Sequence, residues 1–195
     1  MVCAAFGATE NNYGVWSTRI AKQTTRTRDI DEKDFITRAP MMDKDADFVF
    51  VFGGTNDYGH GDALLGGMED TSQYTFYGAV KYLVEYLISV YGKEKLCFVL
   101  PVHRFDENNP YGKNNMKAVK GEPLCRYVQA EREVFSFYGV EYLDTQDLFP
   151  QPNVKTGDEW TTDGLHLTDK GHRLLADKLI EYLQAKIGCG YYKSK

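Results

Sequence analysis

Residues 47–54, Asp-Phe-Val-Phe-Val-Phe-Gly-Gly, decide the fold class of this chain. The run is continuously apolar, rich in aromatic and β-branched residues, and ends in two glycines. Strands that are covered on both faces have this composition, whereas a strand with one wet face alternates polar and apolar residues. Residues 96–102, Leu-Cys-Phe-Val-Leu-Pro-Val, repeat the pattern. The chain is therefore expected to contain a buried parallel sheet.

Two weaker strands and three helices complete this expectation. Residues 140–144 predict a short strand and residues 9–13 a weaker one. Apolar residues at helical intervals predict helices that end before Gly92 and before Gly139, and a third that begins near Thr168 and runs towards Gly188. Strands that alternate with helices indicate a three-layer α/β/α sandwich with a mainly parallel, flavodoxin-like sheet, and ligands of such sheets bind beyond the carboxyl ends of the strands.

Length and composition narrow the class of protein further. The 195 residues are 43% hydrophobic and carry a net charge of -5, which suits one globular domain over residues 1–195. No basic run predicts a nucleic-acid partner, and no apolar stretch approaches the roughly 18 residues of a membrane span. The N-terminus does not resemble a secretory signal, so a cytoplasmic location is expected. The four cysteines are widely spaced, and we expect reduced, largely buried thiols.

The first candidate for chemistry is Asp163-Gly-Leu-His166. A carboxylate three residues before an imidazole can accept a hydrogen bond from Nδ1, which fixes the tautomer and stabilises the imidazolium formed when Nε2 takes a proton. The alternative interpretation is an ordinary polar pair in a loop.

A second candidate, Gly53-Gly-Thr-Asn-Asp57, follows the strongest strand directly. Asn56 could direct its amide group at negative charge that develops on an oxygen. The alternative is a polar turn that Asn56 or Asp57 caps. A third segment, residues 12–21, passes from a strand end through Gly14 towards a helical turn, and its backbone N–H groups could point to the same place as Asn56.

Together these segments resemble the SGNH, or GDSL-type, serine esterase and lipase family, over residues from about Thr9 to Gly171. Gly54-Thr-Asn-Asp57 is similar to the block with the oxyanion asparagine, and Asp163-Gly-Leu-His166 to the block with the catalytic acid and base. The resemblance implies that His166 is the base, Asp163 its orienting acid and Asn56 an oxyanion donor. Gly54 and Asp57 are implied to lie at the oxyanion or substrate site, and the family's glycine donor falls on Ser17, which keeps a backbone N–H.

The family's nucleophile block, Gly-Asp-Ser, does not occur in the 195 residues. The start of the sequence looks truncated, as if a first strand and helix were lost, and Phe6-Gly-Ala-Thr-Glu10 reads as the end of a helix. Because the lost strand would be central, we expect residues 1–20 to fill its position or to be exchanged in a swapped homodimer. Thr9 or Ser17 are alternative nucleophiles, although Thr9 is hindered and Ser17 occupies the oxyanion position.

The resemblance implies a carboxyl-ester hydrolase for small acyl esters or acetylated sugars, without a cofactor, whose activity is weak or absent here. One alternative is a non-catalytic carbohydrate-binding protein of the same fold. Another is a flavodoxin-like or nucleotide-binding module, but no Gly-x-Gly-x-x-Gly or Walker loop follows a strand.

Several other side chains have a functional and an ordinary interpretation. A divalent cation could bind Asp57, His60 and Asp62, although a solvated loop is the preferred interpretation and no metal is expected. An aromatic substrate wall or loop packing could explain Trp16, Tyr58 and Trp160. The substrate mouth or an ion pair could involve His103, Arg104 and Asp106, and His172 is expected at the surface.

Overall fold

The structure, a computed structural model, describes residues 1–25, 29–152 and 158–189. The chain forms two compact units. One consists of Tyr13–Val102 and Asp106–Gln146, and the other of Met1–Asn12, His103–Phe105 and Asp147–Lys195. Each unit combines distant stretches of the sequence. The expectation of a single domain remains a prediction.

The larger unit contains a parallel sheet in the order β1-β2-β3. Its strands are β1 (Val49–Phe52), β2 (Leu96–Val99) and β3 (Glu141–Leu143). Val49 is paired with Leu96, and Cys97 with Glu141. All four residues of β2 are buried, as its continuous apolar run predicts. Three of the four expected strands and their parallel pairing are therefore confirmed.

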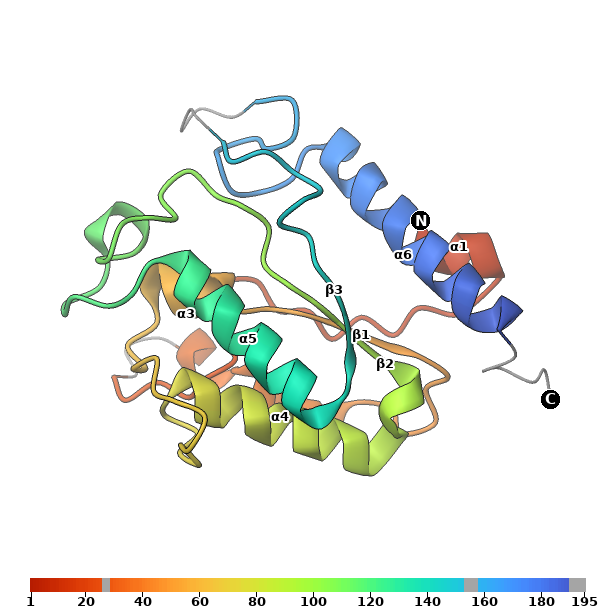
Figure 1. Cartoon of the computed structure of the whole chain (residues 1–195), viewed down its shortest axis with the longest axis horizontal. Coiled ribbons are helices and arrows are strands. Elements are labelled where there is room, and N and C mark those ends of the chain that lie inside the picture. Colours follow the sequence, from red (N-terminus) through yellow and green to blue (C-terminus); the bar gives the residue numbers. More distant parts are fainter. Residues whose placement is uncertain (26–28, 153–157, 190–195) are drawn as a thin grey trace. The chain divides into compact units, whose positions relative to one another are not determined.

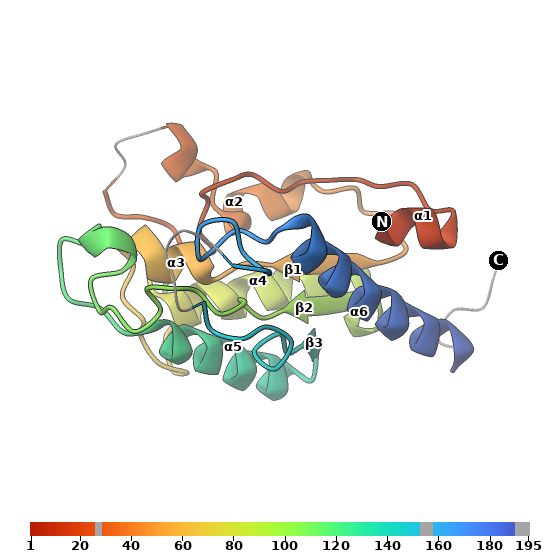
Figure 2. The ribbon, with the colours of Figure 1, turned by 90° about the horizontal axis from the view of Figure 1, so that it is seen from above.

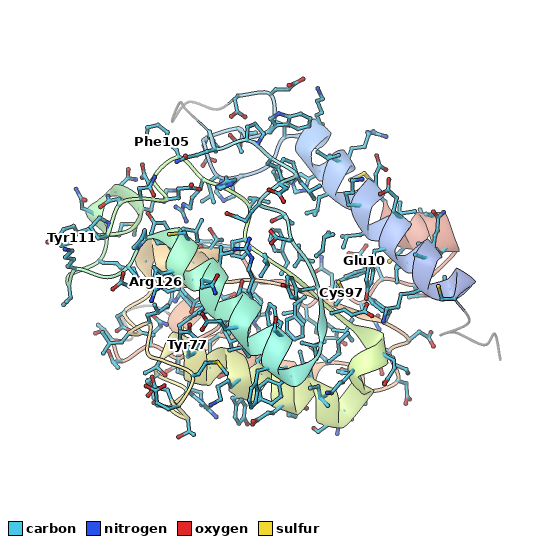
Figure 3. All side chains as sticks on the ribbon, in the orientation of Figure 1. Glu10, Tyr77, Cys97, Phe105, Tyr111 and Arg126 are labelled. Atoms are coloured by element: carbon cyan, nitrogen blue, oxygen red, sulfur yellow. The ribbon has the colours of Figure 1, made fainter. Side chains whose placement is uncertain are left out.

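Two long helices connect these strands, α4 (Phe76–Tyr91) and α5 (Leu124–Tyr138). They lie side by side next to the sheet, as Figures 1 and 2 show. Their buried side chains form one apolar core with those of the sheet. Phe98 of β2 stacks on Phe135 of α5 with ring centroids 4.4 Å apart. The hydroxyl of Tyr77, labelled in Figure 3, donates to Glu133 Oε2 at 2.5 Å and links α4 to α5.

The helix ends follow the sequence signals. Thr75 caps α4 by accepting the N–H of Gly78, and Gly92 ends that helix with a φ of 78°. Gly139 ends α5 in the left-handed region. The remaining helices of the larger unit are short: η1 (Asp29–Glu32), α2 (Phe35–Arg38), η2 (Ala39–Met41), α3 (Thr55–His60), η3 (Lys93–Lys95) and η4 (Lys113–Asn115).

The smaller unit contains α1 (Val2–Phe6) packed against α6 (Asp169–Gly188), side by side in Figure 1. Thr168 caps α6 by accepting the N–H of Gly171 at 3.2 Å, as expected. Gly7 follows α1 with a φ of 62°, so the segment around Phe6 is the end of a helix, as its sequence suggested.

The expected strand at residues 9–13 is wrong. The described residues 1–20 form no strand, and β1 has β2 as its strand neighbour, so these residues do not fill a vacant sheet position. The segment Thr-Glu-Asn-Asn-Tyr is polar and contains two asparagines, a residue that strands disfavour. The swapped homodimer remains a prediction.

The cysteines are all free, but only Cys97 is buried. Cys3 is half-buried, and Cys125 and Cys189 are exposed, so the expectation of largely buried thiols is wrong for these two. Cys125 lies on the solvent face of α5, where helical periodicity places every third or fourth residue outside the core. No helix among the described residues has the length and apolar character needed to cross a bilayer.

Candidate functional site

The turn at residues 163–166 pairs an acid with a histidine in the expected way. Oδ2 of Asp163 lies 2.9 Å from Nδ1 of His166. Oδ1 of the same carboxylate accepts the backbone N–H groups of Leu165 at 3.1 Å and His166 at 2.8 Å. Gly164 takes a φ of 76°, which a side chain would disfavour, and allows this tight turn. The carboxylate thus holds both the backbone and the ring of His166.

Solvent reaches this pair. The side chains are 69% exposed at His166 and 43% exposed at Asp163. Partial burial would raise the pKa of Asp163, but the hydrogen bonds and charge of His166 outweigh it, so the pKa lies below its usual value. An ionised carboxylate on Nδ1 fixes the proton there and makes Nε2 the basic nitrogen. The hydrogen bonds of the described residues do not use Nε2, which leaves it for a substrate or water proton.

Packing around the start of α6 supports the turn. Thr168 donates its backbone N–H to the carbonyl of Trp160 at 2.8 Å and its hydroxyl to the carbonyl of Glu159 at 2.8 Å. A Cβ atom at Gly171 would lie 2.6 Å from the carbonyl oxygen of Trp160, so only glycine permits this approach. The ring of Trp160 packs edge-on against Phe149. These contacts favour loop packing for Trp160.

The glycine pair after β1 forms a close-packed junction. A Cβ atom at Gly53 would lie 2.8 Å from the ring of Phe35, and one at Gly54 would lie 2.8 Å from Oε1 of Glu131. Gly54 also has a φ of 90° and directly precedes α3. The segment after the strand is therefore a short helix and not the polar turn considered as the alternative. Gly54 is buried, and its role in the structure is to allow the backbone conformation that starts α3. That Gly54 lies at the substrate site remains a prediction.

Asn56, in the first turn of α3, is held by residue 18. Its Nδ2 donates to the carbonyl oxygen of Thr18 at 3.0 Å. An amide nitrogen carries two hydrogens. One therefore fixes the side chain, and the other can be donated to a ligand, as an oxyanion donor requires.

Asp57 is 1% exposed and joins α3 to the segment that follows Ser17. Its Oδ2 accepts the backbone N–H of Ile20 and its Oδ1 that of Ala21, both at 2.9 Å. Burial raises the pKa of Asp57 to about 6, against the opposing effects of these two N–H groups and of Arg19 and Lys117. Because the backbone occupies both oxygens, the contacts favour a positioning role over the substrate contact that the resemblance implies.

Ser17 is the position that the resemblance aligns with a glycine. Its φ of 60° is in the left-handed region, which explains why glycine suits the position. Its Oγ lies 3.3 Å from Nε2 of His60. Nη1 of Arg19 lies 3.3 Å from Nδ1 of the same ring. From the sequence, His60 was considered only as a metal ligand. Ser17 and His60 are 43 positions apart, and no local sequence pattern predicts a contact over that separation.

Two ionisable side chains that interact with Asp57, Glu131 and Lys117, were not proposed for the site from the sequence. Glu131 is 2% exposed, its Oε2 has no hydrogen-bond partner among the described residues, and burial together with the charge of Asp57 raises its pKa well above the usual value. Lys117 donates to the hydroxyl of Tyr127 at 2.8 Å, and burial lowers the pKa of this lysine to about 8. Glu131 is three residues from both Val128 and Val134, a spacing that could have indicated its burial on the apolar face of α5. Lys117 lies outside the helices and strands, so periodicity carries no signal for its partial burial.

The other residues that the sequence suggested for a site differ in how far they are buried. Tyr58 is 0% exposed and donates its hydroxyl to the carbonyls of Asp106 and Asn109, so it cannot form part of a substrate wall. Trp16, by contrast, is 79% exposed. Arg104 is buried and His172 exposed, as expected for the latter.

The three residues considered for a cation have separate partners. Both oxygens of Asp62 accept hydrogen bonds from Thr24 and Thr25, whereas Asp57 binds backbone N–H groups elsewhere. The described residues contain no cluster of three or more metal-ligating side chains.

The two parts of the candidate site belong to different units. Asn56, Asp57 and Ser17 lie in the larger unit, and Asp163 and His166 in the smaller one. That they share a cleft remains a prediction.

Comparison with known sequences shows the family. Residues 2–174 match the model of the GDSL-like lipase/acylhydrolase family. The chain belongs to this family. No curated protein matched the chain. The GDSL resemblance seen in the sequence blocks is therefore confirmed over most of the chain.

Solved structures agree with the GDSL fold. A protein of Lactobacillus plantarum is 26% identical, with a TM-score of 0.78 over 94% of this chain and 85% of the other. The aryl esterase of M. smegmatis is 18% identical, with a TM-score of 0.57 over 87% of this chain and 74% of the other. A carbohydrate acetylesterase of Sinorhizobium meliloti is 15% identical, with a TM-score of 0.55 over the same 87% and 74%. The α/β fold with a parallel sheet is confirmed, and the two esterases show a shared fold alone.

Proposed function

We propose that this chain carries the acid–base pair and oxyanion donors of a carboxyl-ester hydrolase for small acyl esters or acetylated sugars, and that its 195 residues lack the attacking serine. The observation that supports this most is the 2.9 Å contact between Oδ2 of Asp163 and Nδ1 of His166, whose side chain is 69% exposed. Family membership supports the reaction class.

Each group then has a defined role. Nε2 of His166 takes a proton, while the carboxylate of Asp163 stabilises the imidazolium. The second N–H of Asn56 and the backbone N–H of Ser17 hold the negative oxygen of the tetrahedral intermediate. Asp57 keeps these donors in place through Ile20 and Ala21.

Without a serine, water is the nucleophile. His166 removes a proton from water, the water oxygen bonds to the carbonyl carbon, and the proton passes to the departing alcohol as its bond to that carbon breaks. Proton transfer by a positioned histidine contributes about 10²- to 10⁴-fold to the rate of such a step. We expect slow turnover of that order.

The test is hydrolysis of p-nitrophenyl acetate and of acetylated oligosaccharides. We expect slow release of p-nitrophenol without a burst, reduced to background by His166→Ala and unchanged by His172→Ala, a matched exposed histidine. Equal rates for wild type and His166→Ala would contradict the role of the dyad. A burst, or covalent labelling of a serine by a fluorophosphonate, would show that a nucleophile is present.

A carbohydrate-binding function without turnover is the second candidate, favoured by the 79% exposure of Trp16. Flat exposed rings bind sugars well. Calorimetric titration with acetylated oligosaccharides should then show binding that Trp16→Ala removes and His166→Ala preserves. No measurable heat with wild type would exclude it.

A further inference from the structure

The contact between Ser17 and His60 has two chemical interpretations. Ser17 Oγ lies 3.3 Å from Nε2 of His60, which could indicate a nucleophile beside its base. A base, however, must carry its free lone pair on the nitrogen that faces the serine. The protonation of the ring therefore decides between a nucleophile and a different role.

Arg19 sets that protonation. A guanidinium has only N–H donors and keeps its charge in proteins, and Nη1 of Arg19 lies 3.3 Å from Nδ1 of His60. Nδ1 must then be the acceptor, so the proton of a neutral ring lies on Nε2. His60 consequently donates to Ser17 Oγ and cannot remove the hydroxyl proton.

We propose that the Ser17 hydroxyl is a third hydrogen-bond donor to the substrate's carbonyl oxygen, kept in that role by a one-way chain from Arg19 through His60. Arg19 donates to Nδ1, Nε2–H donates to Oγ, and the hydroxyl proton is left for a ligand. Ser17 is a contact residue in this scheme, and His60 and Arg19 are positioning residues. The proposal rests on the proposed function, because it adds a donor to the same oxyanion site.

The location of the chain of hydrogen bonds supports this assignment. Ser17 and His60 are half-buried, whereas Arg19 is 3% exposed. The buried guanidinium of Arg19 therefore supports, through His60, a serine hydroxyl that solvent can partly reach. The next residue, Thr18, accepts the amide of Asn56 at 3.0 Å, which brings the asparagine to the same short segment. Ser17 also adopts a φ of 60°, an unfavourable choice for a residue with a side chain. A serine hydroxyl that contributes to ligand binding would account for the unfavourable backbone conformation of Ser17.

Acetate provides the direct test, because its carboxylate offers the oxygen that such donors bind. In the full chain, ¹⁵N NMR titration with acetate should shift the Ser17 backbone N–H and the Asn56 side-chain amide. Ser17→Ala keeps the backbone N–H and Cβ and should weaken acetate binding about tenfold. Ser17→Gly, which also relieves the backbone, should do the same, and Ser89→Ala, an exposed serine on α4, should not.

Substitution of His60 separates the two interpretations. Glutamine can accept from Arg19 with its carbonyl and donate to Ser17 with its amide, but it cannot act as a base. We expect His60→Gln to preserve acetate affinity and His60→Leu to weaken it about as much as Ser17→Ala. If a fluorophosphonate labels Ser17 and His60→Gln abolishes that labelling, the pair is a nucleophile and base and the donor chain is wrong.

The outcomes also separate this proposal from the proposed function. Weaker binding in Asn56→Ala with unchanged binding in Ser17→Ala and Ser17→Gly would overturn the third donor and leave the oxyanion site intact. A wild-type chain that shows no shift with acetate would overturn both.

Discussion

Gly54 lies so close to Glu131 that a Cβ atom on the glycine would be 2.8 Å from the buried Oε1. The glycine also has a φ of 90°. This contact joins the start of α3, which carries Asn56, to the middle of α5. The position of the asparagine thus depends on a residue whose only side-chain atom is hydrogen.

Gly54→Ala should therefore destabilise the protein by about 2–4 kcal/mol, through the positive φ and the clash together. Gly7 is the matched control, since it has a φ of 62° but no atom within 4 Å of the place that a Cβ would take. Gly7→Ala should cost only about 1 kcal/mol. Urea denaturation measures the free energy of unfolding of both variants. Equal losses of stability would show that the close approach to Glu131 does not contribute to the cost of Gly54→Ala.

The titration of Asp57 should leave a signature in stability. Its pKa is about 6 in the folded protein against an ordinary 3.8, so the folded state holds the proton more tightly than the unfolded state. The contribution of the Asp57 carboxyl group to the free energy of unfolding is fully present below about pH 4. It is lost as the pH rises through about 6, by about 3 kcal/mol at most. The charged or titratable neighbours that interact with Asp57 are Arg19, Lys117, Glu131 and Tyr127.

Asp57→Asn isolates that effect from other carboxyl groups. The variant should be less stable, because its amide group faces a backbone N–H where an oxygen had accepted it, at a cost of about 1–3 kcal/mol. The difference in the free energy of unfolding between wild type and variant, measured by urea denaturation, should become smaller from pH 4 to pH 7. A gap that widens over this range would contradict the raised pKa.

The tautomer of His166 follows from its contact with Asp163. In wild type at pH 8 the ring proton should reside on Nδ1, because Oδ2 accepts it at 2.9 Å. Asp163→Ala should give a mixture of tautomers and a lower residual rate of ester hydrolysis. Long-range ¹H–¹⁵N NMR reports the tautomer, and a wild-type ring protonated mainly on Nε2 would refute the assignment.

Thr168 should contribute to stability through its cap of α6. Its hydroxyl oxygen accepts the N–H of Gly171 at 3.2 Å and its proton is donated to Glu159 at 2.8 Å. Thr168→Ala should cost about 1–2 kcal/mol, and Thr168→Ser should recover most of it. Thermal melts of the three proteins test this; if serine is no better than alanine, the hydroxyl does not cap the helix.

Local patterns in the sequence determined the regular elements and the acid–histidine turn. The runs at residues 47–54 and 96–102 predicted β1 and β2, because continuous apolar, β-rich residues are typical of covered strands. The expected burial is complete for β2, whereas Phe52 of β1 is 44% exposed. Gly92, Gly139 and Thr168 marked helix ends by their backbone preferences and hydrogen-bonding groups. The pairing of Asp163 with His166 spans three residues, so chain geometry alone brings them together.

Tertiary structure decided the contacts between distant residues. The sequence could not show that Asp57 binds the N–H groups of Ile20 and Ala21, that Tyr58 is buried, or that His60 lies between Arg19 and Ser17. Hydrogen bonds and burial depend on which segments pack together, and a separation of some 40 residues carries no local signal.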